Sequence, residues 1–330
     1  MALTLLGDVV VYDTFVRTGY LQKLTDVFRI FNNGSAGCIR SRSNDIKGTV
    51  RSENFFKNFG VVSRRDPETN EPQTATKIEM DEHKQFKYFR KFEPVEITDV
   101  AFEVAGNDPK LFYKMFGEML AEKKVLDSVS TAFASLCGAI SSDVSLIHDC
   151  SAVGSGDTLG WLKTVDLIHG IKPFGDKASA IKCFIMHSTP FFQLMLEQQA
   201  AQIIGEIGDM IMYGGTPATF GRPVIVIDDP SLTYTVEEVV YFRTYGLTNQ
   251  AIEVNDNGAT KILGSVVGGN ENIGQVAQGE WTMNSGVKGV QFDSTIGVNA
   301  TNAQLLDSTK WSRWVATKKE TAGTLIISRM

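Results

Sequence analysis

The sequence predicts an α+β protein, in which β-rich stretches surround one very long helix and an alternation of helices and strands follows. Three observations lead to this prediction. Residues 46–98 hold two β-like stretches around a charged segment, residues 109–140 keep a helical spacing of apolar side chains, and residues 158–248 alternate short helical and strand patterns. Hydrophobic residues make up 43% of the 330 positions and charged residues 21%, the balance of a globular chain.

The charge and the cysteines exclude several classes of protein. A formal net charge of −6 and a pI near 5.4 argue against tight nucleic-acid binding, which needs clustered Lys and Arg. No apolar run approaches the ~20 residues that span a bilayer, and residues 1–11 lack the basic leader of a signal peptide. The cysteines are far apart and form no C-x-x-C pair, so we expect four buried, reduced thiols: Cys38, Cys137, Cys150 and Cys183.

The first hundred residues predict a short helix and a long hairpin. Apolar residues at helical spacing indicate a helix over 20–31. Residues 54–63 and 76–98 are rich in Phe, Val, Ile and Tyr, while the segment 64–72 between them is charged and has almost nothing to bury. A strand, a polar tip and a returning strand make a hairpin arm with few apolar residues of its own. We therefore expect a neighbouring molecule to complete it.

The clearest single element is a helix over residues 109–140. Asp108 can cap it and Pro109 suits its first position. Apolar residues then recur in steps of three and four, with Glu122 the one break. At 1.5 Å per residue such a helix is on the order of 50 Å long, against a usual length of about 11–12 residues. Because no second heptad helix is available to pair with it, we expect a spine crossed by a sheet.

The remaining chain alternates between the two types of element. We expect, in chain order, a helix over 158–169 ended by Gly170 and Pro173, a strand over 180–186, one or two helices over 190–212, strands over 223–227, 238–245 and 249–255, a glycine-rich loop over 264–274, strands within 275–298, a helix over about 302–314 and a strand over 323–328.

Candidate catalytic groups are few. His148, Asp149 and Cys150 are adjacent, but neighbouring side chains point apart and triads are assembled from distant positions. His187 ends an expected strand without an obvious partner, so we interpret it as structural. Two acids at 228–229 before Pro230 indicate a turn rather than a metal site. We therefore expect no enzyme, no cofactor and no metal.

Three separated segments carry a resemblance to a known family. The first is the order of an N-terminal arm, a charged hairpin and a solitary long helix. The second runs from Cys183 to Pro190, through a helix, to residues 214–229 with the run Gly221-Arg222-Pro223-Val224. The third is the end of the chain, residues 302–327. Together they resemble the major capsid (coat) protein family of tailed bacteriophages, whose fold is shared with encapsulins and the floor of herpesvirus capsids.

The resemblance implies a division of the chain into parts. Residues 1–45 would be an N-terminal arm and residues 46–98 an extended β-hairpin loop. Residues 99–150, joined by strands from about 249–300, would form a peripheral domain with a spine helix. Residues 151–248, completed by about 301–330, would form an α/β axial domain. The long, charged, helical N-terminal extension of some relatives is not found in this sequence, so we expect either a separate scaffolding protein or a scaffolding segment that is absent from this chain.

The function implied by the resemblance is that of a major capsid protein. Its copies would assemble into hexamers and pentamers, forming an icosahedral or prolate head around double-stranded DNA that is held without sequence-specific binding. Portal and decoration proteins would be further partners, no membrane would be involved, and assembly would take place in the host cytoplasm, giving a virion. The charged arm tip supplies the candidates for contacts between subunits: Arg64, Arg65, Asp66, Glu68 and Glu71.

Two alternatives stay open at this point. An encapsulin-like compartment shares the fold and encloses enzyme cargo instead of a genome. A cysteine/histidine hydrolase built on Cys150 or Cys183 would belong to a different class altogether.

Overall fold

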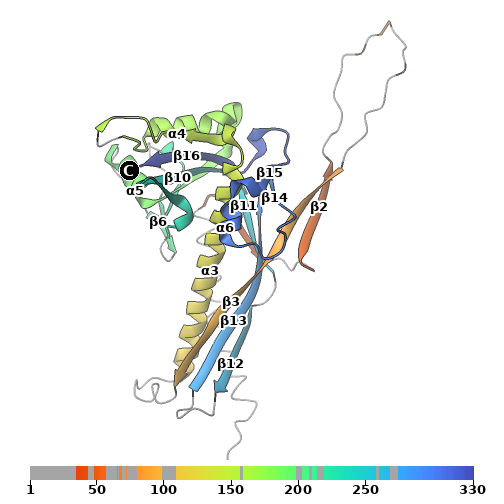
Figure 1. The fold of residues 1–330 in the computed structure, drawn as a ribbon, viewed down its shortest axis with the longest axis vertical. Coiled ribbons are helices and arrows are strands. Elements are labelled where there is room, and N and C mark those ends of the chain that lie inside the picture. The colour runs from red at the N-terminus through yellow and green to blue at the C-terminus, as the bar shows by residue number, and fades with distance from the viewer. Residues whose placement is uncertain are drawn as a thin grey trace, which may run out of the picture.

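The three-dimensional structure is a computed structural model. It describes residues 35–43, 48–56, 65, 67–68, 72, 80–98, 109–156, 159–197, 203–207, 210–213, 219–257, 260–267 and 274–330. In this part of the chain a long shank of one helix and one sheet carries a second, more compact sheet with its helices at one end, and a narrow ribbon leaves the shank on the other side (Figure 1). The expected α+β class is confirmed.

The shank sheet has six strands within the described residues. Its order is β1 (Ile39–Ser43), β11 (Ile252–Asp256), β13 (Gly274–Val287), β3 (Met80–Thr98) and β2 (Val50–Phe56), and β12 (Lys261–Val267) also pairs with β13. β3 is 19 residues long and has two different neighbours. Met80–Phe86 pairs with β2, and the following residues to Thr98 pair antiparallel with β13.

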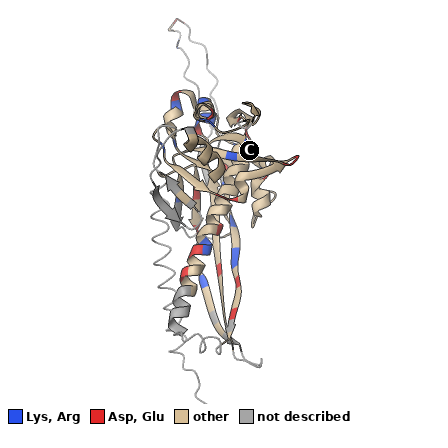
Figure 2. Cartoon of the chain, turned by 90° about the vertical axis from the view of Figure 1, so that its left-hand side faces the viewer, with Lys and Arg blue, Asp and Glu red and all other residues tan. Residues whose placement is uncertain are grey.

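The long helix α3 spans Pro109–Ser141 and confirms the helix predicted over residues 109–140. Phe116 and Leu120 in its first half pack with Trp281 of β13. The second half, from Phe133 to Ile140, joins the main hydrophobic core that is shared with the second sheet. The expected cap Asp108 lies outside the described residues. Figure 2 shows charged residues of both signs along α3 and along the neighbouring shank strands.

The second sheet has eight strands in the described part of the chain. Its order is β4 (Ile147–Asp149), β16 (Gly323–Arg329), β10 (Val239–Thr248), β5 (Ile181–Met186), β8 (Val224–Ile227), β7 (Met210–Tyr213) and β6 (Ile203–Ile207), with β9 (Thr233–Val236) beside β10. β5, β8 and β16 are almost entirely buried. Helix α4 (Thr164–Ile171) packs so closely that a Cβ at Gly170 would collide with Ile326 of β16.

A small unit near the middle of the molecule links the two sheets. It contains helix α6 (Asn302–Leu306) and the ladder of β14 (Val290–Phe292) with β15 (Trp311–Arg313). Thr301 and Gln304 form a capping box that starts α6. α6 lies against α3, so the end of the chain is anchored on the spine before it enters the second sheet.

Several sequence expectations need correction. Among the described residues of the stretch 190–212, the helix α5 (Ser188–Glu197) is followed by β6 and β7 instead of a further helix, because β7 completes the sheet beside β8. The helix expected over 302–314 ends at Leu306, and Trp311 lies in β15. Helix α4 begins at Thr164, six residues later than expected.

Two further boundaries move. β12 occupies part of the expected glycine-rich loop over 264–274. The first hairpin strand is β2 at Val50–Phe56, whereas residues 57–64 and the expected helix over 20–31 lie outside the described residues. The strands expected near 180, 223, 238, 249 and 323 are confirmed as β5, β8, β10, β11 and β16.

Candidate assembly interface

The ribbon of β2 and the first half of β3 is the hairpin arm that the sequence predicts. Val50 lies opposite Phe86 and Phe56 opposite Met80, so the two strands run antiparallel along the arm. Met80 is 62% exposed at the outer end of the pairing. A two-stranded ribbon is marginal by itself in water and normally needs a further layer. The arm therefore offers a surface that another molecule can cover.

The predicted contact residues come between β2 and β3 in the sequence. Arg65 and Glu68 are described and exposed. Arg64, Asp66 and Glu71 lie outside the described residues, so their part in contacts between subunits stays a prediction.

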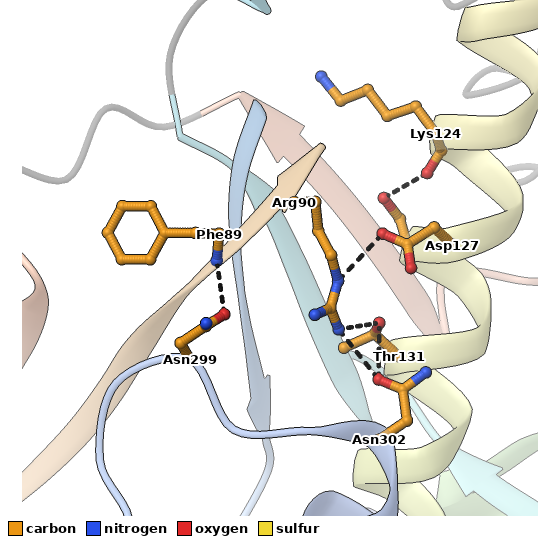
Figure 3. Close-up of polar contacts among 8 residues, drawn as sticks. Phe89, Arg90, Lys124, Asp127, Thr131, Asn299 and Asn302 are labelled. Carbon is orange, nitrogen blue, oxygen red and sulfur yellow. Dashed lines mark hydrogen bonds and ion pairs between the residues drawn. The ribbon is translucent and has the colours of Figure 1, made fainter. Parts of the chain in front are cut away.

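The second half of β3 has an open edge. β2 ends its pairing at Phe86, and among the described residues no strand lies on that side of β3 from Lys87 to Thr98. Asn299 covers only the beginning of this edge. Its backbone N–H donates to Lys87 O at 2.9 Å, and its side-chain oxygen accepts from Phe89 N at 3.1 Å (Figure 3). Such an edge is a template for pairing with another chain.

Phe89 and Val95 show that the same part of β3 is also apolar on its surface. Their exposed fractions are 48% and 42%. Beside Phe89 lies a groove of about 710 Å³ whose lining includes Lys91, Lys261 and Glu280. Glu280 of β13 is directly opposite both lysines, so three neighbouring strands carry a row of alternating charge. The exposed aromatic group could lie in the apolar centre of a protein interface, with the charged row at its polar rim.

A polar joint holds β3, α3 and α6 together at the upper end of the groove. Arg90 Nε lies 3.3 Å from Asp127 Oδ2, and its Nη2 donates to Thr131 Oγ1 at 3.3 Å and to Asn302 Oδ1 at 3.0 Å (Figure 3). Burial raises the pKa of the Asp127 carboxyl, although the Arg90 charge acts in the opposite direction. The joint fixes the angle between the spine helix and the strand that leads into the arm.

A second joint lies one helical turn earlier on α3. Lys124 is 2% exposed, and its Nζ lies 2.5 Å from Asp256 Oδ2 of β11 and 2.8 Å from Thr260 Oγ1. Figure 3 shows its side chain pointing away from Arg90, toward a different part of the sheet. Sequence reasoning missed both joints. The apolar spacing of the helix gave no signal for Lys124, because position 124 lies opposite the stripe through residues 119, 126 and 129.

The candidate catalytic side chains at residues 148–150 are held in structural contacts. Cys150 is fully buried, its Sγ donates to Ile327 O at 3.1 Å, and burial raises the pKa of its thiol to about 12. His148 Nε2 lies 3.4 Å from Asp166 Oδ1. The other carboxylate oxygen of Asp166 accepts from Lys163 N, directly before α4. His148, Asp149 and Cys150 thus form no catalytic arrangement.

His187 has a partner that the sequence did not reveal. Its Nε2 lies 3.3 Å from Asp228 Oδ1, and its Nδ1 accepts from Thr189 N at 3.2 Å at the start of α5. Asp229 accepts from Ser231 N at 2.8 Å, which confirms the expected turn. The described residues contain no group of three or more His, Cys, Asp and Glu placed to hold a metal ion. In the same residues, no helix combines the length and the apolar character needed to cross a membrane.

Comparisons with known proteins agree with this architecture. A sequence profile of the family described as "Gp13-like: Major capsid protein 13-like" matches residues 8–325. No curated protein matches the chain.

Solved structures give the same picture of the fold. The capsid of Ralstonia phage GP4 is similar with a TM-score of 0.52 and 7% identity, over 88% of this chain and 87% of that chain. The cyanophage Pam1 capsid asymmetric unit gives 0.51 and 10%, over 90% and 92%. Mycobacterium phage Cain gives 0.51 and 7%, over 90% and 89%. At these identities the likeness concerns the fold.

Proposed function

The chain belongs to the Gp13-like major capsid protein family, and we propose how its copies join to form the head of a tailed phage. Proteins of this family and fold are structural components of phage capsids and associate with one another in the virion. The similar structures of Ralstonia phage GP4 and cyanophage Pam1 are phage capsids, which favours a genome-enclosing coat over a compartment for enzyme cargo. We propose that the copies form hexamers and pentamers that close into an icosahedral or prolate shell around double-stranded DNA.

The arm is the observation that carries this proposal. The ribbon of Val50–Phe56 with Met80–Phe86 leaves the body of its own chain, and the open edge of β3 from Lys91 onward is a surface without a strand partner among the described residues. In a shell of identical copies, each arm lies across a neighbour. Such head-to-tail contacts close into rings when the rotation between copies fits. The charged tip around Arg65 and Glu68 then adds polar contacts at the boundary.

Many weak contacts suit this task better than one strong contact. Burial of apolar area gives about 25 cal/mol per Å², but association and side-chain ordering offset much of it. Individual exposed ion pairs add roughly 0.2–1 kcal/mol. Each contact therefore stays reversible, so misplaced subunits can leave before the shell closes.

The proposed domains follow the two sheets. α3 packs against β11 and β13, which share a sheet with β12 and support a peripheral domain of residues 99–150 joined by 249–300; β1 and β3, from the proposed arms, complete the same sheet. β5, β8, β10 and β16 share the other sheet, which supports an axial domain of residues 151–248 completed by 301–330. Residues 1–45 and 46–98 would be the two arms.

The further partners are also proposals. A separate scaffolding protein, a portal and decoration proteins would act with this chain, and assembly would take place in the host cytoplasm. The net charge of −6 supports confinement of DNA without sequence-specific binding. Catalysis is not part of the proposed role, which is supported by the burial of Cys150 and Cys183 and by their raised thiol pKa values.

Charge reversal at the arm tip tests the proposal. We expect the variant Arg64→Glu/Arg65→Glu to form far fewer closed particles than the wild type, because like charges then meet acidic groups across the boundary. Light scattering and negative-stain electron microscopy measure the particles, and circular dichroism of the subunit should be unchanged. The matched control Arg64→Lys/Arg65→Lys keeps the charge and should assemble. Normal particles from the reversed variant would rule out a role of the tip in assembly.

A further inference from the structure

Two of the four cysteines face each other across the junction of the two sheets. Cys38 directly precedes β1 of the shank sheet, and Cys183 lies in the middle of β5 in the second sheet. The Cys38 thiol donates to Leu247 O at 3.6 Å. Leu247 is the residue directly opposite Cys183 in the pairing of β10 with β5. The Cys38 thiol thus lies against β10 at the position where β10 pairs with Cys183.

Their side chains are in contact as well. A hydrogen bond between the Cys38 and Cys183 thiols raises the pKa of Cys183 well above its ordinary value, and burial acts in the same direction. Both residues are 0% exposed. The other two thiols donate to carbonyl oxygens elsewhere, Cys137 to Ser231 O at 3.4 Å and Cys150 to Ile327 O at 3.1 Å. Cys38 also donates to a carbonyl oxygen, that of Leu247, but its contact with Cys183 is the one interaction between two thiols among the four described cysteines.

We propose that Cys38 and Cys183 form a site of intrachain disulfide formation, which closes when the protein meets a disulfide oxidant such as oxidised glutathione. The Cys38 thiolate attacks one sulfur of the oxidant, its S–S bond breaks, and one glutathione thiolate leaves and takes up a proton. The Cys183 thiolate then attacks the Cys38 sulfur and releases the second glutathione. Two protein thiols are oxidised, and one oxidised glutathione is reduced to two thiols.

The location of Cys38 gives the oxidant a route to a buried pair. β1 is an edge strand of five residues, and the turn before it contains Ala36 and Gly37, both with positive φ. Short edge segments open locally more readily than central strands. Opening of Ser35–Cys38 exposes the Cys38 thiol while Cys183 stays in its sheet. The closed bond ties the first strand of the shank to the second sheet and encloses the arm and α3 in the covalent loop.

This inference is independent of the assembly proposal, and the test reads the bond directly. The reduced protein is incubated with oxidised glutathione, blocked with N-ethylmaleimide under denaturing conditions and digested with trypsin. We expect two blocked thiols instead of four, and, before blocking, a mass two hydrogens below that of the reduced protein. Without reduction, the peptide of residues 30–40 should be disulfide-linked to the peptide that begins at Cys183. Under denaturing, non-reducing electrophoresis the chain should stay a monomer.

Matched variants separate this pair from the other cysteines. In Cys137→Ser/Cys150→Ser, oxidation should still consume both remaining thiols. In Cys38→Ser no intrachain disulfide should form, so any loss among its three thiols should be a mixed disulfide with glutathione. The melting temperature of the oxidised wild type should rise by several degrees and return after dithiothreitol treatment. Four free thiols after oxidation, a link between other cysteines, or a glutathione adduct on Cys38 that never closes would each overturn the proposal.

Discussion

A buried lysine and a half-buried aspartate on α3 set the geometry of the shank at the residue scale. Lys124 and Asp127 both point from the spine toward the sheet, and each meets a group from a different strand. Buried pairs of this kind contribute little net stability compared with apolar packing, but they are costly to break one-sidedly. Their effect here is to define how the spine crosses the sheet from which the arm departs.

Removing the Lys124 charge should destabilise the subunit strongly. Lys124→Met leaves Asp256 without its ammonium partner in a mostly buried position, and we expect a loss of about 3–5 kcal/mol in the free energy of unfolding. Urea unfolding of the unassembled subunit measures it. The exposed neighbour Lys123→Met is the control and should change stability by less than about 0.5 kcal/mol. Equal effects of both variants would show that the Lys124 pair has no special role.

Asp127 should make stability depend on pH in a defined direction. Its folded-state pKa lies above the ordinary value of 3.8, so the ionised carboxylate opposes folding at neutral pH. As the pH falls through the folded pKa, the carboxyl is protonated first in the folded chain, and this cost disappears. It is fully removed below the unfolded pKa. Urea unfolding of the wild type and of Asp127→Asn should therefore show the wild type gaining stability relative to the variant between neutral pH and about pH 4. A difference that is constant or moves the other way contradicts the assignment.

At the element scale, close contact between helices and strands depends on small residues. Gly138 of α3 leaves room for the Leu305 carbonyl of α6 and for Trp311, whose Nε1 donates to that carbonyl at 2.8 Å. A Cβ at Gly138 would lie 2.5 Å from Trp311 Nε1. Since real Cβ contacts are never that short, α6 and β15 would have to move away from the spine.

Gly138→Ala should consequently cost stability even though alanine favours helices. We expect a loss of about 1–3 kcal/mol from overpacking, reduced by the helix-propensity gain of roughly 0.5–1 kcal/mol. Thermal unfolding followed by circular dichroism measures the change. Ser130→Ala, at a half-buried position of the same helix, is the control and should be near neutral. A stabilised Gly138→Ala variant would contradict the described packing of α3 on α6.

Local signals predicted the elements that are governed by local rules. The helix over 109–140 was evident from Pro109 and an apolar spacing with a single break at Glu122, and strands such as β5 and β8 were evident from short apolar runs. β6 and β7 could not be predicted in this way, because a short apolar run such as that around Ile203 fits a helix or a strand. Only pairing with the edge of β8 decides between the two.

The candidate interface was predictable only in part for the same reason. The low apolar content of the arm indicated a hairpin that needs a partner. The open edge of β3 arises because β2 ends at Phe86 while β3 continues to Thr98, and this depends on pairing with β13, some 190 residues later in the chain. The cover by Asn299 and the Arg90 joint likewise bring together residues that are distant in sequence.

The whole molecule has the form of a building block. Its two sheets share one core through the upper part of α3, while the arm and the lower shank extend away from that core. A body with such extensions exposes more unpaired surface than a compact globule of the same length, and a shell of identical copies is the setting in which this surface becomes buried. Assembly through the arm is therefore the central claim.

The most direct test is cryo-electron microscopy of the wild type beside a variant with a shortened arm. Phe56 lies directly opposite Met80, so an Asn-Gly turn can replace residues 57–79 without changing the pairing of β2 with β3. We expect closed shells or rings of five and six subunits from the wild type, and separate folded subunits with unchanged circular dichroism from the variant. Shells of normal number and size from the shortened variant, or a wild type that stays monomeric even with its scaffolding protein, would contradict assembly through the arm.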